Sequence, residues 1–153
     1  MKLVVMIPAY NEEKTIPGVI SEIPRRIDGI DSVQVLVIDD GCTDGTVAAA
    51  QKAGADKIIH HIKNKGLGIT FRDGLDAALG MGADIIVNID GDGQLNPLDI
   101  PRLIAPIVEN RADIVLGWRD IENLDFMPPG KKIGNRLATR ATRMLSGFPI
   151  KDA

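Results

Sequence analysis

Short apolar runs alternate with longer amphipathic stretches along almost the whole chain. The apolar runs are rich in Val and Ile, which is typical of buried strands. They predict strands at Lys2–Ile7, Val33–Ile38, Lys57–Ile62, Ala83–Ile89 and Ala112–Leu116. Between them, apolar residues recur three or four positions apart, as on one face of a helix. Helices are predicted at Glu13–Arg26, Asp44–Ala53 and Gly68–Leu79, after the cap residue Asn96, and at about Lys131–Ser146.

This alternation predicts an α/β fold in which helices cover both faces of a mainly parallel central sheet. Gly74 is expected to interrupt the helix at Gly68–Leu79, because glycine is unfavourable inside a helix. A length of 153 residues is enough for one domain with a substantial core. We therefore expect a single domain over residues 1–153.

The composition argues against several classes of protein. Aromatic residues make up 3% of the chain, too few for the stacking surface that binds single-stranded nucleic acid, so no nucleic-acid partner is expected. No apolar run approaches the ~20 residues of a membrane-spanning helix. The single cysteine, Cys42, excludes an internal disulfide and suits a reducing, cytoplasmic compartment.

The net charge of −3 conceals a basic segment. Residues 126–151 contain six Lys and Arg and no Asp or Glu, a charge of +6, so the remaining residues carry −9. Lys132, Arg136 and Arg140 recur every four residues and would share one face of the predicted last helix. That face is either a solvated surface or a weak, salt-sensitive contact with anionic lipid headgroups.

Oxygen-bearing side chains follow the strand predicted at Ala83–Ile89. In an extended chain, Asp90, Asp92 and Gln94 would project to the same side. Carboxylate and amide oxygens are the ligands that Mg²⁺ or Mn²⁺ prefers, and the incomplete set leaves room for substrate phosphates. A solvated Asp-Gly turn is the simpler alternative. The position favours the metal site, because open α/β sheets bind ligands at the carboxyl ends of their strands.

Two other predicted strands end in residues that could recognise a base. Asp39 and Asp40 follow the second strand, and a carboxylate there could accept the imide N–H of uracil or guanine. Tyr10, after the first strand, could stack on such a base. Alternatively, the two aspartates only begin a turn or a helix.

Four motifs together resemble the family 2 glycosyltransferases. In chain order they are Pro8-Ala9-Tyr10-Asn11-Glu12-Glu13, Asp39-Asp40-Gly41-Cys42-Thr43-Asp44-Gly45-Thr46, Asn64-Lys65-Gly66-Leu67-Gly68 and Asp90-Gly91-Asp92-Gly93-Gln94. The resemblance implies the GT-A fold, a Rossmann-like αβα sandwich that binds a nucleotide sugar. Within the family, the chain is most similar to the dolichyl- and polyprenyl-phosphate mannose or glucose synthases.

The resemblance also implies a role for individual residues. Asp90, Asp92 and Gln94 would hold the divalent metal, which makes Asp92 part of the catalytic machinery. Arg119 would meet the acceptor phosphate, with Lys132, Arg136 and Arg140 towards the acceptor and the membrane. The nucleotide sugar would be bound by Pro8, Ala9, Tyr10, Glu12, Val37, Asp39 and Gly91.

The implied reaction is a metal-dependent, inverting transfer of a hexose from a GDP- or UDP-sugar to a polyprenyl or dolichyl phosphate. It would run at the cytoplasmic face of a membrane. A sugar hydroxyl as acceptor would instead need a carboxylate base, for which Asp120, Glu122 and Asp125 are candidates. Lys151-Asp152-Ala153 resembles a point where relatives continue, so we expect a catalytic domain truncated at its C-terminus. Such a piece could also bind a nucleotide sugar with little turnover.

Overall fold

The computed structural model describes residues 1–117, 139, 140, 142 and 144. The chain divides into two compact units, Met1–Asp113 and Ile114–Ala153. The first unit contains every strand and helix whose bounds are given below.

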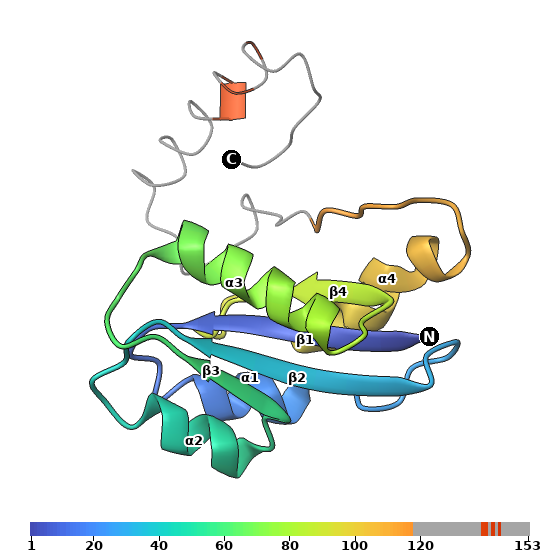
Figure 1. Cartoon of the computed structure of the whole chain (residues 1–153). Helices are drawn as coiled ribbons and strands as arrows, with labels where there is room; N and C mark the ends of the chain where they lie inside the picture. The colour runs from blue at the N-terminus through green and yellow to red at the C-terminus, as the bar shows by residue number, and fades with distance from the viewer. Residues whose placement is uncertain (118–138, 141, 143, 145–153) are drawn as a thin grey trace. The chain divides into compact units, whose positions relative to one another are not determined.

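Within the described residues, a parallel sheet of four strands forms the centre of the first unit (Figure 1). Its strands are β1 (Lys2–Ala9), β2 (Ser32–Asp39), β3 (Lys57–His60) and β4 (Ile85–Asn88). Their spatial order is β3-β2-β1-β4, so β1 pairs with β2 on one side and with β4 on the other. The strands predicted from the apolar runs are confirmed for these four.

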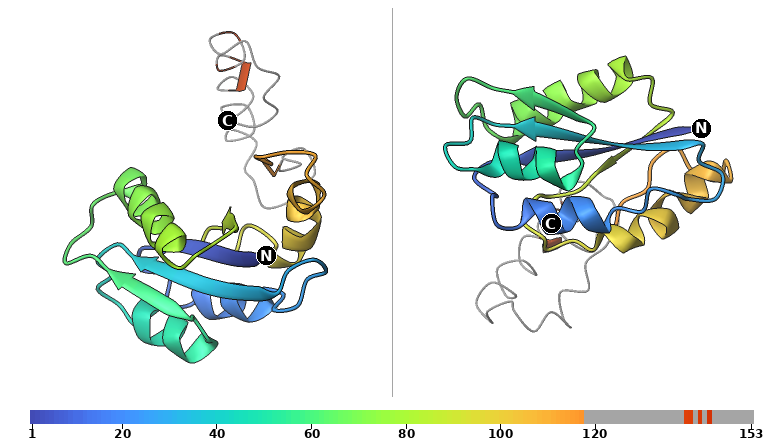
Figure 2. Two further views of the ribbon diagram at one scale, coloured as in Figure 1. Left: turned by 45° about the vertical axis from the view of Figure 1, so that its right-hand side comes forward. Right: turned by 90° about the horizontal axis from the view of Figure 1, so that it is seen from below.

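Helices cover both faces of this sheet, with α3 on one side and α1 and α2 on the other (Figure 2). The helices are α1 (Ile16–Glu22), α2 (Thr46–Ala53), α3 (Leu67–Gly80), the short 3₁₀ turn η1 (Pro97–Asp99) and α4 (Ile100–Val108). Alternate residues of β1 point to opposite faces. Val5 joins a core cluster with residues of α1, α2 and α4, whereas Met6 joins a second cluster with α3. The predicted αβα sandwich is therefore confirmed.

Local sequence explains where several helices begin and end. The Asn96 side chain accepts a hydrogen bond from the backbone N–H of Leu98 at 3.0 Å and so caps η1. Gly54 ends α2 in the left-handed conformation, with φ of 98°. Helix α1 is shorter than predicted because Ile23 precedes Pro24 and adopts an extended backbone, which the proline ring favours.

Helix α3 runs without interruption through Gly74, contrary to the prediction. A Cβ at this position would lie 2.9 Å from Cδ1 of Ile38 and 3.4 Å from Sδ of Met6. The missing side chain thus lets α3 approach the sheet closely. Packing of the helix against the sheet outweighs the modest propensity cost of one glycine.

The strand predicted at Ala112–Leu116 is wrong, because the described residues 112–117 form no strand. Ile114 and Leu116 are 80% and 87% exposed, so burial does not favour an extended conformation there. No helix among the described residues is long and apolar enough to cross a membrane.

The close contact at Gly74 predicts the effect of adding a side chain. Gly74→Val should lower the free energy of unfolding by about 1–3 kcal/mol, since the added methyl groups overpack against Ile38. Gly80→Ala is the matched control, because nothing lies within 4 Å of a Cβ at that end of the same helix. Urea denaturation of both variants measures the difference. Equal stability of the two would contradict the packing described.

Candidate functional site

The order of the strands places a switch in chain direction at the centre of the sheet. The chain runs from β1 to β2 and β3, then crosses back to place β4 on the other side of β1. Ligands of open α/β sheets bind at the carboxyl ends of the two strands that flank such a switch. Here these ends lead into two of the predicted motifs, Pro8–Glu13 after β1 and Asp90–Gln94 after β4.

The surroundings of Gly91 show that the two motifs lie close together. A Cβ on Gly91 would lie 3.5 Å from Cγ2 of Ile7, 3.6 Å from Cγ of Glu12 and 3.6 Å from the carbonyl oxygen of Pro8. Gly91 itself is buried. The structure therefore brings together three of the residues predicted to bind the nucleotide sugar, namely Pro8, Glu12 and Gly91.

Residues 90–94 form a turn rather than an extension of β4. Gly93 has φ of 77°, and the backbone N–H of Gln94 donates to Oδ1 of Asp92 at 2.9 Å. The side-chain alternation expected of an extended chain therefore does not apply to Asp90, Asp92 and Gln94. Such an aspartate-centred turn is a common way for Asp-Gly sequences to fold.

The donor atoms of this turn still suit a divalent cation. Asp90 and Gln94 are exposed and Asp92 is partly exposed, so two carboxylates and an amide are within reach of solvent. Hard oxygen donors of this kind fit Mg²⁺ or Mn²⁺. The described residues contain no group of three or more His, Cys, Asp or Glu placed to hold a metal. A cation here would therefore need further oxygens from water or from a substrate.

The loops after β1 and β2 are fastened together by hydrogen bonds. The backbone N–H of Thr43 donates to Oδ1 of Asn11 at 2.8 Å, and the backbone N–H of Asn11 lies 3.2 Å from Sγ of Cys42. The Cys42 thiol donates in turn to the carbonyl oxygen of Ala9 at 3.4 Å. Burial and the neighbouring Asp39 carboxylate raise the pKa of Cys42 to about 11, so this thiol keeps its proton. Tyr10 stands 49% exposed on the same rim.

Asp39 ends β2 as a nearly buried carboxylate, only 6% exposed. Its Oδ1 accepts the backbone N–H of Cys42 at 2.7 Å, and its Oδ2 lies 3.0 Å from Nδ1 of His60. Burial opposes ionisation, but these hydrogen bonds outweigh it and hold the pKa of Asp39 below its usual value. Asp39 is thus an ionised acceptor at neutral pH. Val37, by contrast, is fully buried in the core, so its side chain presents no surface to a ligand.

Asp40 has a structural role that was not predicted from the sequence. Its carboxylate accepts the backbone N–H groups of Lys65 at 2.8 Å and Gly66 at 3.0 Å, and lies 2.9 Å from Nδ1 of His61. The other ring nitrogen of His61 is 3.1 Å from Oδ2 of Asp73 in α3. Despite its burial, these bonds hold the pKa of Asp40 below its usual value. Asp40 therefore fixes the loop between β3 and α3.

The two histidines are the residues that sequence reasoning missed. The chain contains only two, His60 and His61, and they stand side by side at the end of the third predicted strand. Each pairs with one of the two consecutive aspartates that end the neighbouring strand. The sequence shows two aspartates at the end of one predicted strand and two histidines at the end of the next. It does not show the register between the two strands, which decides whether these residues meet.

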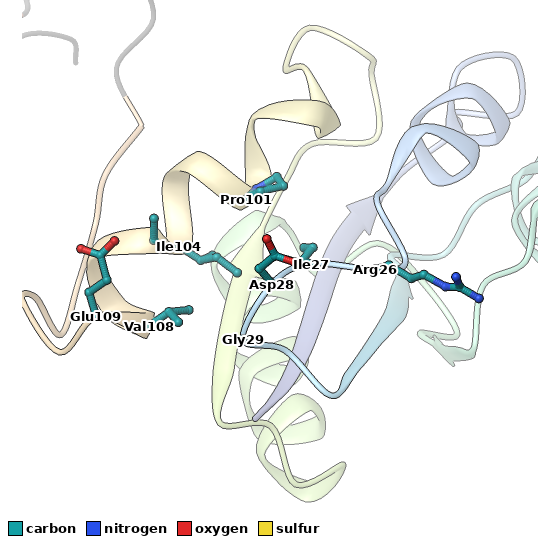
Figure 3. Close-up of a pocket in the computed structure, with 9 residues that line it drawn as sticks. Arg26, Ile27, Asp28, Gly29, Pro101, Ile104, Val108 and Glu109 are labelled. Carbon is teal, nitrogen blue, oxygen red and sulfur yellow. The ribbon is translucent and has the colours of Figure 1, made fainter.

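A separate groove of about 570 Å³ lies away from this rim (Figure 3). It is formed by α4 and the loop that leads into the amino end of β2. Its lining includes Ile27, Gly29, Ile104 and Val108. The groove contains none of the predicted site residues.

Most of the residues predicted to meet the acceptor or the membrane lie outside the part of the chain that the structure describes. Arg119, Lys132 and Arg136 lie outside the described residues. Arg140 is described, and it is helical and exposed. Thr142 and Met144 are helical as well, in agreement with the helix predicted over this part of the chain.

Comparison with known proteins identifies the family. Residues 4–151 match the model of the family described as "Glycosyl transferase family 2", and the chain belongs to this family. The family predicted from the four motifs is thereby confirmed.

Two relatives and one solved structure illustrate the similarity. The UDP-N-acetylglucosamine–dolichyl-phosphate N-acetylglucosaminyltransferase of Methanococcus voltae is 32% identical over 97% of this chain and 64% of its own. The polyprenol monophosphomannose synthase of Mycolicibacterium smegmatis is 30% identical over 99% of this chain and 58% of its own. The chain thus spans less than two thirds of either relative. Glucosyl-3-phosphoglycerate synthase from Mycobacterium tuberculosis, crystallised with Mn²⁺, UDP and phosphoglyceric acid, is 31% identical, with a TM-score of 0.57 over 70% of this chain and 39% of its own.

The buried network around Asp40 predicts a large loss of stability. Asp40→Ala should lower the free energy of unfolding by about 3 kcal/mol, because it leaves Nδ1 of His61 and the backbone N–H of Lys65 without their acceptor. Asp76→Ala, which removes an exposed carboxylate from α3, is the control and should change little. Since folding lowers the pKa of Asp40, its contribution is complete above the ordinary value of 3.8 and is lost as the pH falls through the folded-state pKa. The gap between wild type and Asp40→Ala, measured by urea denaturation, should therefore narrow in acid. A constant gap would refute this role.

Proposed function

We propose that this chain is the donor-binding catalytic domain of an inverting hexosyltransferase. It would transfer a hexose from a UDP- or GDP-linked sugar to a polyprenyl or dolichyl phosphate, with Mg²⁺ or Mn²⁺. The observation that carries the proposal is the close approach of Gly91 to Pro8 and Glu12 at the switch between β1 and β4. Both named relatives act on lipid phosphates according to their names, which supports the acceptor class.

The nucleoside would lie over the carboxyl ends of β1 and β2. Asp39 is an ionised acceptor there and suits a base imide N–H. Tyr10, half exposed on the same rim, offers an aromatic face for stacking. Pro8, Ala9 and Glu12 would shape the pocket between these two residues. The ribose and phosphates would then lead towards Gly91, where the loop after β4 lies close to the loop after β1.

Asp90, Asp92 and Gln94 would hold the divalent cation beside the diphosphate. The bound ion would neutralise the charge of the nucleoside diphosphate leaving group. The two carboxylates supply the negative charge that retains the ion, and the amide of Gln94 adds a neutral oxygen. Because the protein supplies only part of the shell, nucleotide and metal should bind cooperatively.

A lipid phosphate acceptor would need no general base. A phosphate monoester has a second pKa of about 6 and is mostly dianionic at pH 7. The protein must therefore guide a charge rather than remove a proton. Arg119 would meet the acceptor phosphate, and Lys132, Arg136 and Arg140 would hold the basic segment near anionic headgroups at the cytoplasmic face of a membrane.

The role of the metal is testable by comparing the binding of a nucleoside diphosphate with that of the nucleoside alone. Asp90→Asn and Asp92→Asn should each weaken binding of UDP or GDP in the presence of Mn²⁺ by at least about tenfold, since each removes a charged ligand. Binding of the corresponding nucleoside, which lacks the diphosphate, should not change. Asp99→Asn, in η1, is the control. Calorimetry with and without EDTA measures all of these, and nucleoside diphosphate binding indifferent to metal would contradict the proposed site.

The acceptor is testable with labelled donors and polyprenyl phosphate in vesicles. Label should transfer to the lipid, and faster in anionic than in zwitterionic vesicles, because the basic segment concentrates the protein at the charged surface. The triple variant K132E/R136E/R140E should lose that advantage but keep its rate in detergent. Equal transfer rates in anionic and zwitterionic vesicles would contradict the proposed contact of the basic segment with the membrane. Metal-dependent nucleotide binding without any transfer to lipid phosphate would show a binding module rather than an enzyme.

A further inference from the structure

Two aspartate–histidine pairs lie at the ends of β2 and β3, one in the last register pair and one just beyond it. Asp39 is in register with His60, and the two side chains meet at 3.0 Å. Asp40 and His61 repeat the pairing one residue further on, at 2.9 Å. The two histidines differ in their surroundings, because the side chain of His60 is 55% exposed and that of His61 only 3%. His60 therefore reaches the rim on which the nucleoside would lie, whereas His61 belongs to the interior.

The pairing with His60 uses part of the acceptor capacity of Asp39. An ionised carboxylate has about four lone-pair positions on two oxygens. Cys42 N–H occupies one position on Oδ1, and His60 Nδ1 occupies one on Oδ2. The side chain of Asp39 is only 8% exposed, so little of the remaining surface is open to a ligand. We expect Asp39 to accept one further donor from the rim, not two side by side.

Uracil and guanine differ in the number of donors that they present. Uracil offers one ring N–H between two carbonyl groups. Guanine offers a ring N–H with an exocyclic amino group beside it, and this pair of donors matches both oxygens of one carboxylate. At Asp39, each oxygen already has one partner, so such a fork would compete with Cys42 N–H and His60 for the small part of the carboxylate that is exposed. Displacing the backbone N–H of Cys42 would leave this donor without its acceptor, which is unfavourable.

We propose that His60 is a specificity-determining residue that, by engaging Oδ2 of Asp39, makes the pocket select uridine over guanosine nucleotides. The donor would accordingly be a UDP-linked sugar. This proposal rests on the proposed function, since it requires that Asp39 recognise the base. His60 would act through Asp39 rather than on the reacting atoms.

The test compares the affinities of UDP and GDP, each with Mn²⁺ at one fixed pH, for the whole chain and three variants. Wild type should bind UDP at least about tenfold more tightly, the ratio expected when one hydrogen bond to a charged group is lost. His60→Ala should reduce this ratio at least threefold, because Oδ2 becomes available to guanine. His60→Asn should retain the ratio, since its amide nitrogen can take the place of Nδ1. Lys57→Ala, an exposed change at the other end of β3, is the matched control.

The outcomes separate this proposal from the one on which it rests. Equal affinities, or a preference for GDP in wild type, would overturn the selectivity while leaving a nucleotide-binding domain. A ratio unchanged in His60→Ala would overturn the role of His60. Wild-type protein that binds neither nucleotide would refute both proposals. Because the wild-type ratio alone can contradict the selectivity, the test does not depend on the variants folding.

Discussion

The parallel pairing of β1 with both β2 and β4 is the constraint on which the rest of the structure depends. Residues Leu3–Ile7 of β1 are fully buried, so both faces of this strand are covered by packed side chains. The register places Ala9 beside Asp39 on one side and Met6 beside Asn88 on the other. A slip of one residue would turn every side chain of β1 to the opposite face. The same burial that stabilises the sheet therefore fixes which loops meet at its rim.

The carboxylates of the rim divide into two groups by their surroundings. Asp39 and Asp40 are nearly buried, and each is held by a histidine and by backbone N–H groups, so their charges support the loops around them. Asp90 and Asp92 lie in a turn with greater access to solvent. This division suits a site in which the buried pair, Asp39 and Asp40, positions the base and its loops. The more accessible pair, Asp90 and Asp92, would then share a cation with the diphosphate.

Much of the fold could be predicted from the sequence, because buried parallel strands leave continuous apolar runs and their helices leave a helical period. The errors arose where tertiary packing decided the outcome. Close packing of Gly74 on Ile38 preserved a helix that propensity alone would break. Pro24 shortened α1, and exposed Ile114 and Leu116 formed no strand although their pattern resembled one.

The strand ends that carry the candidate residues could be predicted, but the local geometry of these residues could not. Strand order brought Gly91 to Pro8 and Glu12, as parallel connectivity requires. Side-chain alternation failed at residues 90–94, because a turn replaced the extended chain. The histidine partners of Asp39 and Asp40 depended on the register between β2 and β3, which a single sequence does not specify.

The proposed function requires that the turn after β4 hold a divalent cation together with a nucleoside diphosphate. A crystal structure of the chain with Mn²⁺ and UDP, with anomalous scattering recorded for manganese, examines it most directly. We expect one strong anomalous peak coordinated by Asp90, Asp92, Gln94 and both phosphates, with the uracil ring at Asp39. A nucleotide bound without manganese at that turn, or manganese bound elsewhere in the chain, would contradict it.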